Sequence, residues 1–319
     1  MAEKLKLALY WAASCGGCEI AVVELREKLL IVDQVADILF WPVAVDAKYK
    51  DVEAMPDGHI DVCLFNGAIR TSENEHLAHL LRQKSKVLVA FGSCANEGCM
   101  PGLANLYDRE SIFDYAYKES PSADNPNKVV PQQVNMMPEG EIRIPKFYQT
   151  VKTLPQVEDV DYHIPGCPPQ APQIWAAIEA IVQGKLPPKG SVVGANEKTV
   201  CDECKHDRKE KAIKRFYRTY EIIPESTQCL FDQGLICAGP ATRGGCGALC
   251  TKVDVPCRGC YGPPPHVIDQ GAALMSAAAS VVDANTEEEA ARIVGEIADP
   301  VGTFYRFGLP ASLLHRRKI

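Results

Sequence analysis

The sequence lacks the features that mark membrane-spanning, exported or nucleic-acid-binding proteins. Its longest apolar runs fall short of the roughly 18 residues that a membrane-spanning helix needs, so we expect no transmembrane span. Residues 1–6 lead directly into an alternating, strand-like segment, without the apolar block of a signal peptide and without a twin arginine. We therefore expect a cytoplasmic protein. Because 34 Lys and Arg face 41 Asp and Glu, the formal net charge of −7 provides no overall basic field for nucleic acid.

Nucleotide-binding loops are also missing. Neither the G-x-G-x-x-G pattern nor the G-x-x-x-x-G-K-S/T pattern occurs, and the glycines around Cys246 fit neither of them. Hydrophobic residues make up 46% of the chain and charged residues 24%, which excludes a disordered or simple repetitive protein. The length of 319 residues favours a chain of about two domains.

Strand and helix patterns alternate through the first half of the chain. Apolar runs of strand length lie at 5–11, 38–41, 60–65 and 87–91. Amphipathic patterns predict one helix beginning near residue 18 and further helices at 72–84 and 171–183. Ser72 is the expected N-cap of the second helix, with Glu75 as its reciprocal partner, and residues 120–145 should be irregular. This order predicts an α/β fold, with a parallel sheet covered by helices on both faces.

The second part of the chain differs in character. Eight cysteines, many glycines and prolines and little apolar periodicity occur between Cys201 and Cys260, so this segment should fold around something bound. Helices are expected at about 265–282 and from the capping residue Thr286 onward. We predict one domain over residues 1–185 and a smaller, largely irregular domain over residues 190–319, joined by a linker rich in Gly and Pro.

Fourteen cysteines are the unusual feature of the composition. In a large chain without an export signal, metal binding explains them better than a disulfide framework. One group is placed in loops that follow predicted strands: Cys15, Cys18, Cys94 and Cys167. Loops at the carboxyl ends of parallel strands converge on one crevice, so these four thiolates could surround one inorganic cluster.

The remaining cysteines allow more than one interpretation. Two further groups of four are Cys201, Cys204, Cys229 and Cys237, then Cys246, Cys250, Cys257 and Cys260. Taken alone, these two groups could be structural zinc sites, because Cys-x-x-Cys pairs serve zinc as well as iron–sulfur clusters. Cys63 lies inside a predicted strand and is interpreted as a small buried hydrophobic residue. Cys99 is close enough to Cys94 in the sequence to compete with it as a ligand.

The ordered set of motifs resembles a known family. Cys-Gly-Gly-Cys-Glu, Gly-Ser-Cys-Ala and Pro-Gly-Cys-Pro-Pro, followed by eight cysteines, are similar to the small, electron-transferring subunit of nickel–iron hydrogenases. The chain looks in particular like the gamma subunit of the cytoplasmic, viologen-reducing type that is linked to heterodisulfide reductase. The resemblance covers essentially the whole chain. It implies a flavodoxin-like N-terminal domain with a proximal cluster and a C-terminal domain with a medial and a distal cluster.

The resemblance implies three [4Fe-4S] clusters and assigns their ligands. The proximal ligands would be Cys15, Cys18, Cys94 and Cys167. The distal ligands would be Cys201, Cys204, Cys229 and Cys237. The medial ligands would be Cys246, Cys250, Cys257 and Cys260. Three positions depart from periplasmic relatives: Cys201 replaces a distal histidine, a fourth cysteine is present in the medial set, and Ser14 replaces a glutamate before the first cysteine.

The function that the resemblance implies is electron relay within an enzyme complex. The chain would carry no catalytic residue and would be inactive alone, because the nickel–iron centre that oxidises hydrogen would belong to a large subunit. Expected partners are that large subunit, a small iron–sulfur delta subunit and heterodisulfide reductase, which would place the complex in methanogenesis. Two alternatives stay open: the small subunit of a hydrogenase that reduces a deazaflavin coenzyme or a nicotinamide, and a zinc-stabilised scaffold protein without redox function.

Basic residues are concentrated between Lys205 and Arg218, between two of the expected distal ligands. Two interpretations fit this stretch. It could be a solvated face, or it could be a docking patch for an acidic redox partner.

Overall fold

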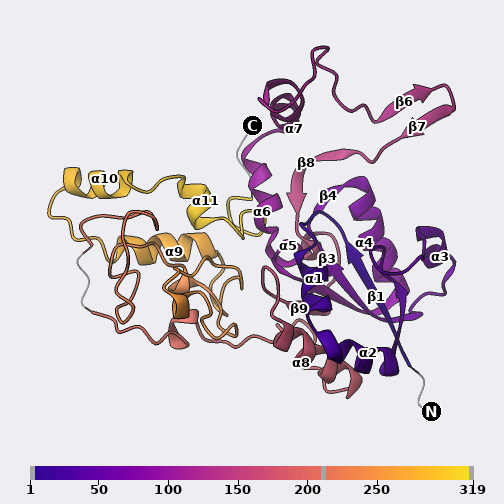
Figure 1. Ribbon diagram of the computed structural model, residues 1–319, viewed down its shortest axis with the longest axis horizontal. Coiled ribbons are helices and arrows are strands. Elements are labelled where there is room, and N and C mark those ends of the chain that lie inside the picture. Colours follow the sequence, from indigo (N-terminus) through magenta and orange to yellow (C-terminus); the bar gives the residue numbers. More distant parts are fainter. Residues whose placement is uncertain (1–3, 210–212, 316–319) are drawn as a thin grey trace.

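The computed structural model describes residues 4–209 and 213–315, in which a sheet with its helices lies beside a C-terminal part with little regular structure (Figure 1). The sheet strands are β1 (Leu5–Trp11), β2 (Ala36–Phe40), β3 (Ile60–Asn66), β5 (Ser85–Phe91) and β9 (Tyr162–Ile164). Their spatial order is β2-β1-β3-β5-β9, and every pairing is parallel. This is the flavodoxin-like strand order, so the predicted α/β class is confirmed.

Helices cover both faces of the sheet. One face carries α3 (Tyr49–Ala54) and α4 (Ser72–Lys84). The other carries α1 (Gly17–Val23), α2 (Leu29–Val35) and α8 (Ala171–Val182). Alternate side chains of each strand point to opposite faces, so Ala8 and Tyr10 pack with α3 and α4 while Leu9 packs with α1 and α8. Both faces are therefore apolar, as a buried parallel sheet requires.

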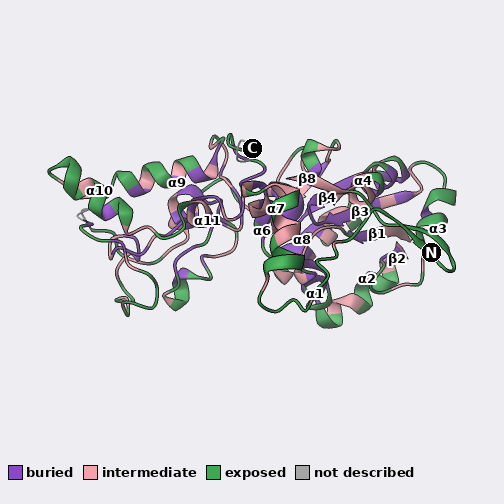
Figure 2. Ribbon diagram, turned by 90° about the horizontal axis from the view of Figure 1, so that it is seen from above, coloured by how far each residue is buried: buried purple, intermediate pink, exposed green. Residues whose placement is uncertain are grey.

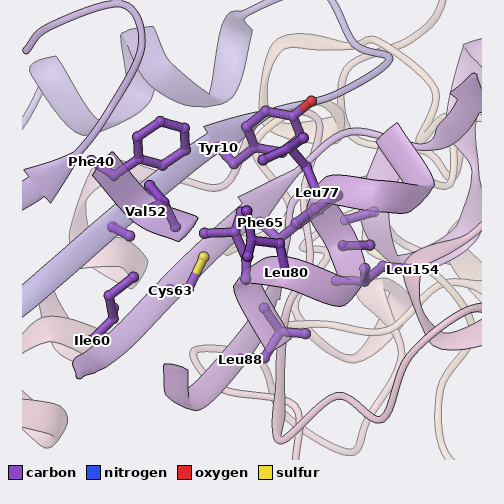
Figure 3. Close-up of a cluster of buried hydrophobic side chains, with 14 of the residues drawn as sticks. Tyr10, Phe40, Val52, Ile60, Cys63, Phe65, Leu77, Leu80, Leu88 and Leu154 are labelled. Carbon is purple, nitrogen blue, oxygen red and sulfur yellow. The ribbon is translucent and has the colours of Figure 1, made fainter. Parts of the chain in front are cut away.

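Cys63 lies in the middle of the hydrophobic core between the sheet and helices α3 and α4 (Figure 3). It is fully buried on β3, between Ala8 of β1 and Leu88 of β5. Among the described residues it is the only cysteine of this core cluster, so no second thiol is near enough to share a metal, and burial raises the pKa of its thiol to about 12. The interpretation of Cys63 as a small hydrophobic core residue agrees with this position.

Replacement of Cys63 by alanine should leave the metal content unchanged. It should lower the free energy of unfolding by about 1 kcal/mol, because only one buried atom is removed from the core. Iron analysis and thermal unfolding of the variant beside the parent protein check both expectations. A loss of iron would contradict a purely structural role for this thiol.

The structure corrects three local predictions. Thr71, not Ser72, is the N-cap of α4, and Asn74 is its reciprocal partner in place of Glu75. The segment expected to be irregular contains a hairpin of β6 (Val134–Met137) and β7 (Gly140–Arg143). Its turn, Pro138-Glu139, is not one of the Asn-Gly or Asp-Gly pairs that announce a hairpin. The first C-terminal helix, α9 (Gln270–Ala279), begins at the capping residue Asp269 and not near residue 265.

The other elements are short. Strand β4 (Ile69–Thr71) pairs with β8 (Phe147–Lys152) in an antiparallel ladder. The segment after β5 forms α5 (Ser93–Glu97), α6 (Cys99–Gly102) and α7 (Arg109–Asp114). The C-terminal part contains α9, α10 (Glu287–Gly295) and α11 (Pro300–Phe304), with Thr286 capping α10 as predicted. Within the described ranges, we find no helix that is both long and apolar enough to cross a bilayer.

The C-terminal part has its own core and is joined to the α/β part. Its buried residues include Phe216, Phe231 and Leu274, which form a cluster separate from those of the sheet. Figure 2 shows the two parts side by side. Hydrogen bonds connect them: Tyr261 donates to Gln173 Oε1 at 2.8 Å, and the backbone N–H of Cys99 donates to Phe307 O at 2.8 Å. The two parts are therefore joined at α8 and at Cys99, whose Sγ lies 3.8 Å from Cys167 Sγ.

Candidate metal centres

The loops that carry the first cysteine group meet at the carboxyl ends of the strands. Cys15 follows β1, Cys18 lies in the first turn of α1, Cys94 lies in α5 after β5, and Cys167 follows β9. Two backbone hydrogen bonds of 2.8 Å join the last two loops, from the N–H of Gly92 to Ile164 O and from the N–H of Ser93 to Gly166 O. This convergence is the one that the strand pattern predicted.

Gly92 lets the Cys94 loop approach Cys18 closely. Its φ of +82° lies in the left-handed region that favours glycine, and a Cβ atom on it would lie 2.4 Å from Cys18 Sγ. Burial, followed by the charges of Glu19, Cys167, Cys15 and Cys99, raises the pKa of the Cys18 thiol. The Cys94 loop thus lies so close to Cys18 Sγ that residue 92 has no room for a side chain.

Cys99 brings a fifth thiol to this place. It is buried, its Sγ lies 3.8 Å from Cys167 Sγ, and it packs with Cys94, Phe307 and Cys260. Its φ of +46° is a conformation that residues other than glycine rarely adopt, and the hydrogen bond to Phe307 O helps to hold it. Both Cys94 and Cys99 therefore adjoin the first group, and the choice between them as ligand stays open on geometry alone.

The second group of four thiols also converges. Burial raises the pKa of the Cys201 thiol to about 12, and the neighbouring thiols of Cys237, Cys229 and Cys204 add to the rise. A Cβ atom on Gly239 would lie 3.0 Å from Cys201 Sγ and 3.6 Å from Cys237 Sγ, so this backbone also lies directly against the sulfurs. The Cys201–Cys204 pair and the more widely spaced Cys229 and Cys237 thus line one sulfur-rich site.

Arg208 faces this second group. Burial lowers the pKa of its guanidinium, but the thiols of Cys201 and Cys229 outweigh that effect and raise it above its ordinary value. Arg208 of the basic stretch therefore interacts with the sulfurs although the residue is exposed, while residues 210–212 of the stretch lie outside the described residues. Sequence reasoning missed this contact, because an irregular segment has no periodicity from which the direction of a side chain follows.

The third group lies between the other two. Burial raises the pKa of the Cys260 thiol to about 12, and the thiols of Cys246, Cys167 and Cys250 contribute, while the backbone of Cys167 opposes the rise. At the other side, the backbone N–H of Cys257 donates to Cys237 Sγ at 3.2 Å. Cys167 belongs to the first group and Cys237 to the second, so Cys260 adjoins the first group and Cys257 adjoins the second.

The donor atoms of these sites are thiols, which suit soft metals and iron–sulfur clusters. Thiols whose pKa values are raised by burial and by one another need a bound cation to remain ionised together. Among the residues that the structure describes, no set of three or more Cys, His, Asp or Glu side chains is arranged to hold a single metal ion. Thiol donors of this kind are consistent with iron–sulfur clusters, whose ligands are cysteine thiolates.

A buried carboxyl lies beside the first group. Glu19 is buried, and the amide of Asn66 donates to both of its carboxyl oxygens at 2.9 Å and to Ser14 Oγ at 3.0 Å. Burial raises the pKa of Glu19. The sequence showed only a glutamate after Cys18 that ordinary helix-start preference explains, so its burial and its contact with Asn66 were not foreseen.

Comparisons with known proteins identify the class. A family model described as "NADH ubiquinone oxidoreductase, 20 Kd subunit" matches residues 15–181. The chain is 44% identical to the iron-sulfur subunit of the F420-non-reducing hydrogenase of Archaeoglobus profundus over 98% of both chains. It is 36% identical to the corresponding F420-non-reducing hydrogenase subunit of Methanothermobacter thermautotrophicus, over 98% of this chain and 97% of that one.

Solved structures agree with the fold. A crystal structure of an NAD+-reducing [NiFe]-hydrogenase matches at a TM-score of 0.50 and 26% identity, over 58% of this chain and 94% of that chain. The recombinant [NiFeSe] hydrogenase of Desulfovibrio vulgaris Hildenborough matches at a TM-score of 0.51 and 15% identity, over 83% of this chain and 95% of that chain. The fold and the cysteine-lined sites define the small, electron-transferring subunits of nickel–iron hydrogenases. Within this class, the chain belongs to the family of small subunits of F420-non-reducing hydrogenases, which confirms the predicted resemblance.

Family membership also decides between the interpretations of the cysteines. The chain is part of a hydrogenase complex, an oxidoreductase acting on H2, in which it works with partners such as a large subunit. Its role there is iron–sulfur electron transfer. The alternative of a zinc-stabilised scaffold protein is therefore excluded.

Proposed function

We propose that this chain holds three [4Fe-4S] clusters in series and relays electrons from the large subunit to a heterodisulfide reductase. The proximal ligands are Cys15, Cys18, Cys94 and Cys167. The medial ligands are Cys246, Cys250, Cys257 and Cys260, and the distal ligands are Cys201, Cys204, Cys229 and Cys237. When bound, such clusters supply one-electron oxidation and reduction. In this proposal residues 1–185 carry the proximal ligands and residues 190–319 carry the other two sets.

The observation that carries the proposal is that the third thiol group adjoins both of the others. Cys167 contacts the Cys260 sulfur, and Cys257 contacts the Cys237 sulfur. Each contact joins a residue of one set to a residue of the next, so neighbouring sets adjoin without intervening side chains. Backbone N–H groups that donate to the sulfurs also stabilise the thiolate form, which supports cluster binding.

An exposed apolar surface beside Cys15 supports contact with the large subunit near the proximal ligands. A groove there is lined by Trp11, Cys15, Ile20 and Val23, and Ile20 is 63% exposed and Val23 56% exposed. Contiguous apolar surface of this kind marks a protein–protein interface. The large subunit would then cover Cys15 and exclude water from the first thiol group.

The choice of electron acceptor rests on the relatives. The curated relatives with 36–44% identity are named as hydrogenases that do not reduce F420, so the deazaflavin-reducing alternative is not favoured. The NAD-reducing relative shares only 25% identity over 57% of this chain. We therefore keep heterodisulfide reductase as the acceptor, reached through a small iron–sulfur delta subunit, and a cytoplasmic location for the complex.

Metal and sulfide analysis of anaerobically purified protein tests the cluster count. We expect about twelve irons and twelve acid-labile sulfides per chain, because each of the three four-cysteine sets accommodates one four-iron cluster. Electron paramagnetic resonance after reduction should show interacting spins, since adjoining clusters couple magnetically. About eight irons would mean that one of the three ligand sets is wrong, and zinc without sulfide would overturn the proposal.

A further inference from the structure

A hollow of about 320 Å³ lies in the C-terminal part, outside the three thiol groups. Three arginines line it: Arg218, Arg258 and Arg306. They come from segments far apart in the sequence, so the fold and not a run of basic residues brings their charges together. Phe216 and Tyr217 form part of the wall.

The three guanidinium groups are poorly compensated by negative charge. Across residues 4–209 and 213–315, none of them has a carboxylate oxygen within the 4.0 Å that defines an ion pair. Glu296 lines the hollow, but it accepts from the backbone N–H of Phe216 and pairs with Arg292. Asp299 acts as the cap of α11 by accepting from the N–H of Gly302. The nearby carboxylates therefore have other partners.

Arg306 is held in place for a ligand. Its Nε donates to Gly302 O at 3.0 Å, which fixes the side chain at the end of α11. Burial lowers the pKa of its guanidinium and the positive charge of Arg258 lowers it further. The charge of Asp299 opposes this fall, and that of Arg218 adds to it. Three like charges held together are unfavourable unless an anion joins them, so the hollow is suited to carboxylates.

Two strongly exposed side chains follow Arg218 in the chain and favour a protein over a small anion as the ligand. The turn after Arg218 presents Tyr220, which is 82% exposed, and the following segment presents Ile223, which is 98% exposed. A small anion would leave this apolar surface in water. Tyrosine and arginine together are typical of the residues that contribute most to protein–protein interfaces.

The position of the hollow points to the outer end of the electron path. Arg218 lies between Cys204 and Cys229 in the chain, and Arg258 lies between Cys257 and Cys260. A protein docked here would contact the segments that carry the distal and the medial thiols. We propose that this arginine hollow is the docking socket of an acidic electron-transfer protein, whose carboxylates enter between Arg218, Arg258 and Arg306. This inference rests on the proposed relay function.

The test uses the complex of this chain with its large subunit and three electron acceptors. These are a two-cluster bacterial ferredoxin as an acidic protein, cytochrome c as a basic protein, and a small viologen dye. In Arg218→Glu, kcat/KM for ferredoxin at low salt should fall about tenfold, mainly through KM, because docking charges govern encounter. The difference should shrink at high ionic strength. Hydrogen-dependent reduction of the dye should not change.

The matched control is Arg143→Glu, which makes the same charge change on the exposed strand β7 of the α/β part. It should leave all three rates unchanged, and Arg218→Lys should restore most of the ferredoxin rate. An unchanged KM for ferredoxin in Arg218→Glu overturns the docking proposal. A second result would also overturn it: pyrophosphate binds saturably, this binding is lost in Arg218→Glu, and the ferredoxin kinetics stay constant. The hollow would then be a site for a small anion. If the unaltered complex reduces no acceptor with hydrogen, the relay function itself fails.

Discussion

Serine in place of Cys94 is expected to remove about four of the twelve irons and to lower hydrogen-dependent dye reduction at least 100-fold, on the order of the largest effects seen at metal sites. Cys94 lies in the loop that Gly92 and Ser93 fasten to the Cys167 loop, so it belongs to the wall around Cys18. A serine hydroxyl is a weak substitute for a thiolate. Isotope exchange between H2 and water, which requires no electron relay, should persist in the complex.

Cys99→Ser is the matched control, because it makes the same chemical change at a buried cysteine 3.8 Å from Cys167 Sγ. We expect this variant to keep its iron and its dye-reducing activity. Iron and sulfide analysis of both variants decides between the two cysteines. The exchange assay shows in each case that the large subunit is intact. The reverse pattern would assign Cys99 as the proximal ligand, and loss of iron in both variants would indicate that the fifth thiol also binds the cluster.

The sequence predicted the sheet well, and also the loops that meet at its edge, for definite physical reasons. Strand runs such as 60–65 alternate between two apolar faces, and a parallel sheet places the loops after its strands at one edge. Cys15, Cys94 and Cys167 follow three different strands, so their convergence follows from topology without knowledge of any contact. Family membership then came from the order of the motifs, which a single short motif could not have given.

Contacts between irregular segments could not be predicted in this way. The approach of Arg208 to the distal thiols and of Arg218 to Arg306 depends on how segments without periodicity are folded over one another. The cap of α4 was misplaced by one residue because Thr71 and Ser72 are both good capping residues, and only the backbone shows which one lies outside the helix. The hairpin at 134–143 was missed because its exposed residues bury no apolar face.

Alanine in place of Gly92 is expected to disrupt the proximal site as fully as the loss of a ligand. The new Cβ would lie 2.4 Å from Cys18 Sγ, where neither the backbone of the 92–94 loop nor the buried thiol can easily move. The φ of +82° adds strain of its own. Overpacking and the left-handed conformation together should cost about 2–5 kcal/mol, which is a large fraction of the roughly 5–15 kcal/mol that stabilises a typical protein. About four of the twelve irons should be lost.

Gly184→Ala provides the control that separates strain from contact. Gly184 also has a positive φ, +63°, but a Cβ atom there would meet no atom within 4 Å. This variant should lose only about 1 kcal/mol through the strained backbone and keep all its iron. Iron content and thermal unfolding of the two variants, measured side by side, give the comparison. Equal iron content in both would mean that Cys18 moves aside without consequence, and the close approach of Gly92 would then have no part in holding the proximal cluster. A deficit confined to Gly92→Ala would show that the Cys94 loop must lie directly against Cys18, a requirement that only glycine at residue 92 meets.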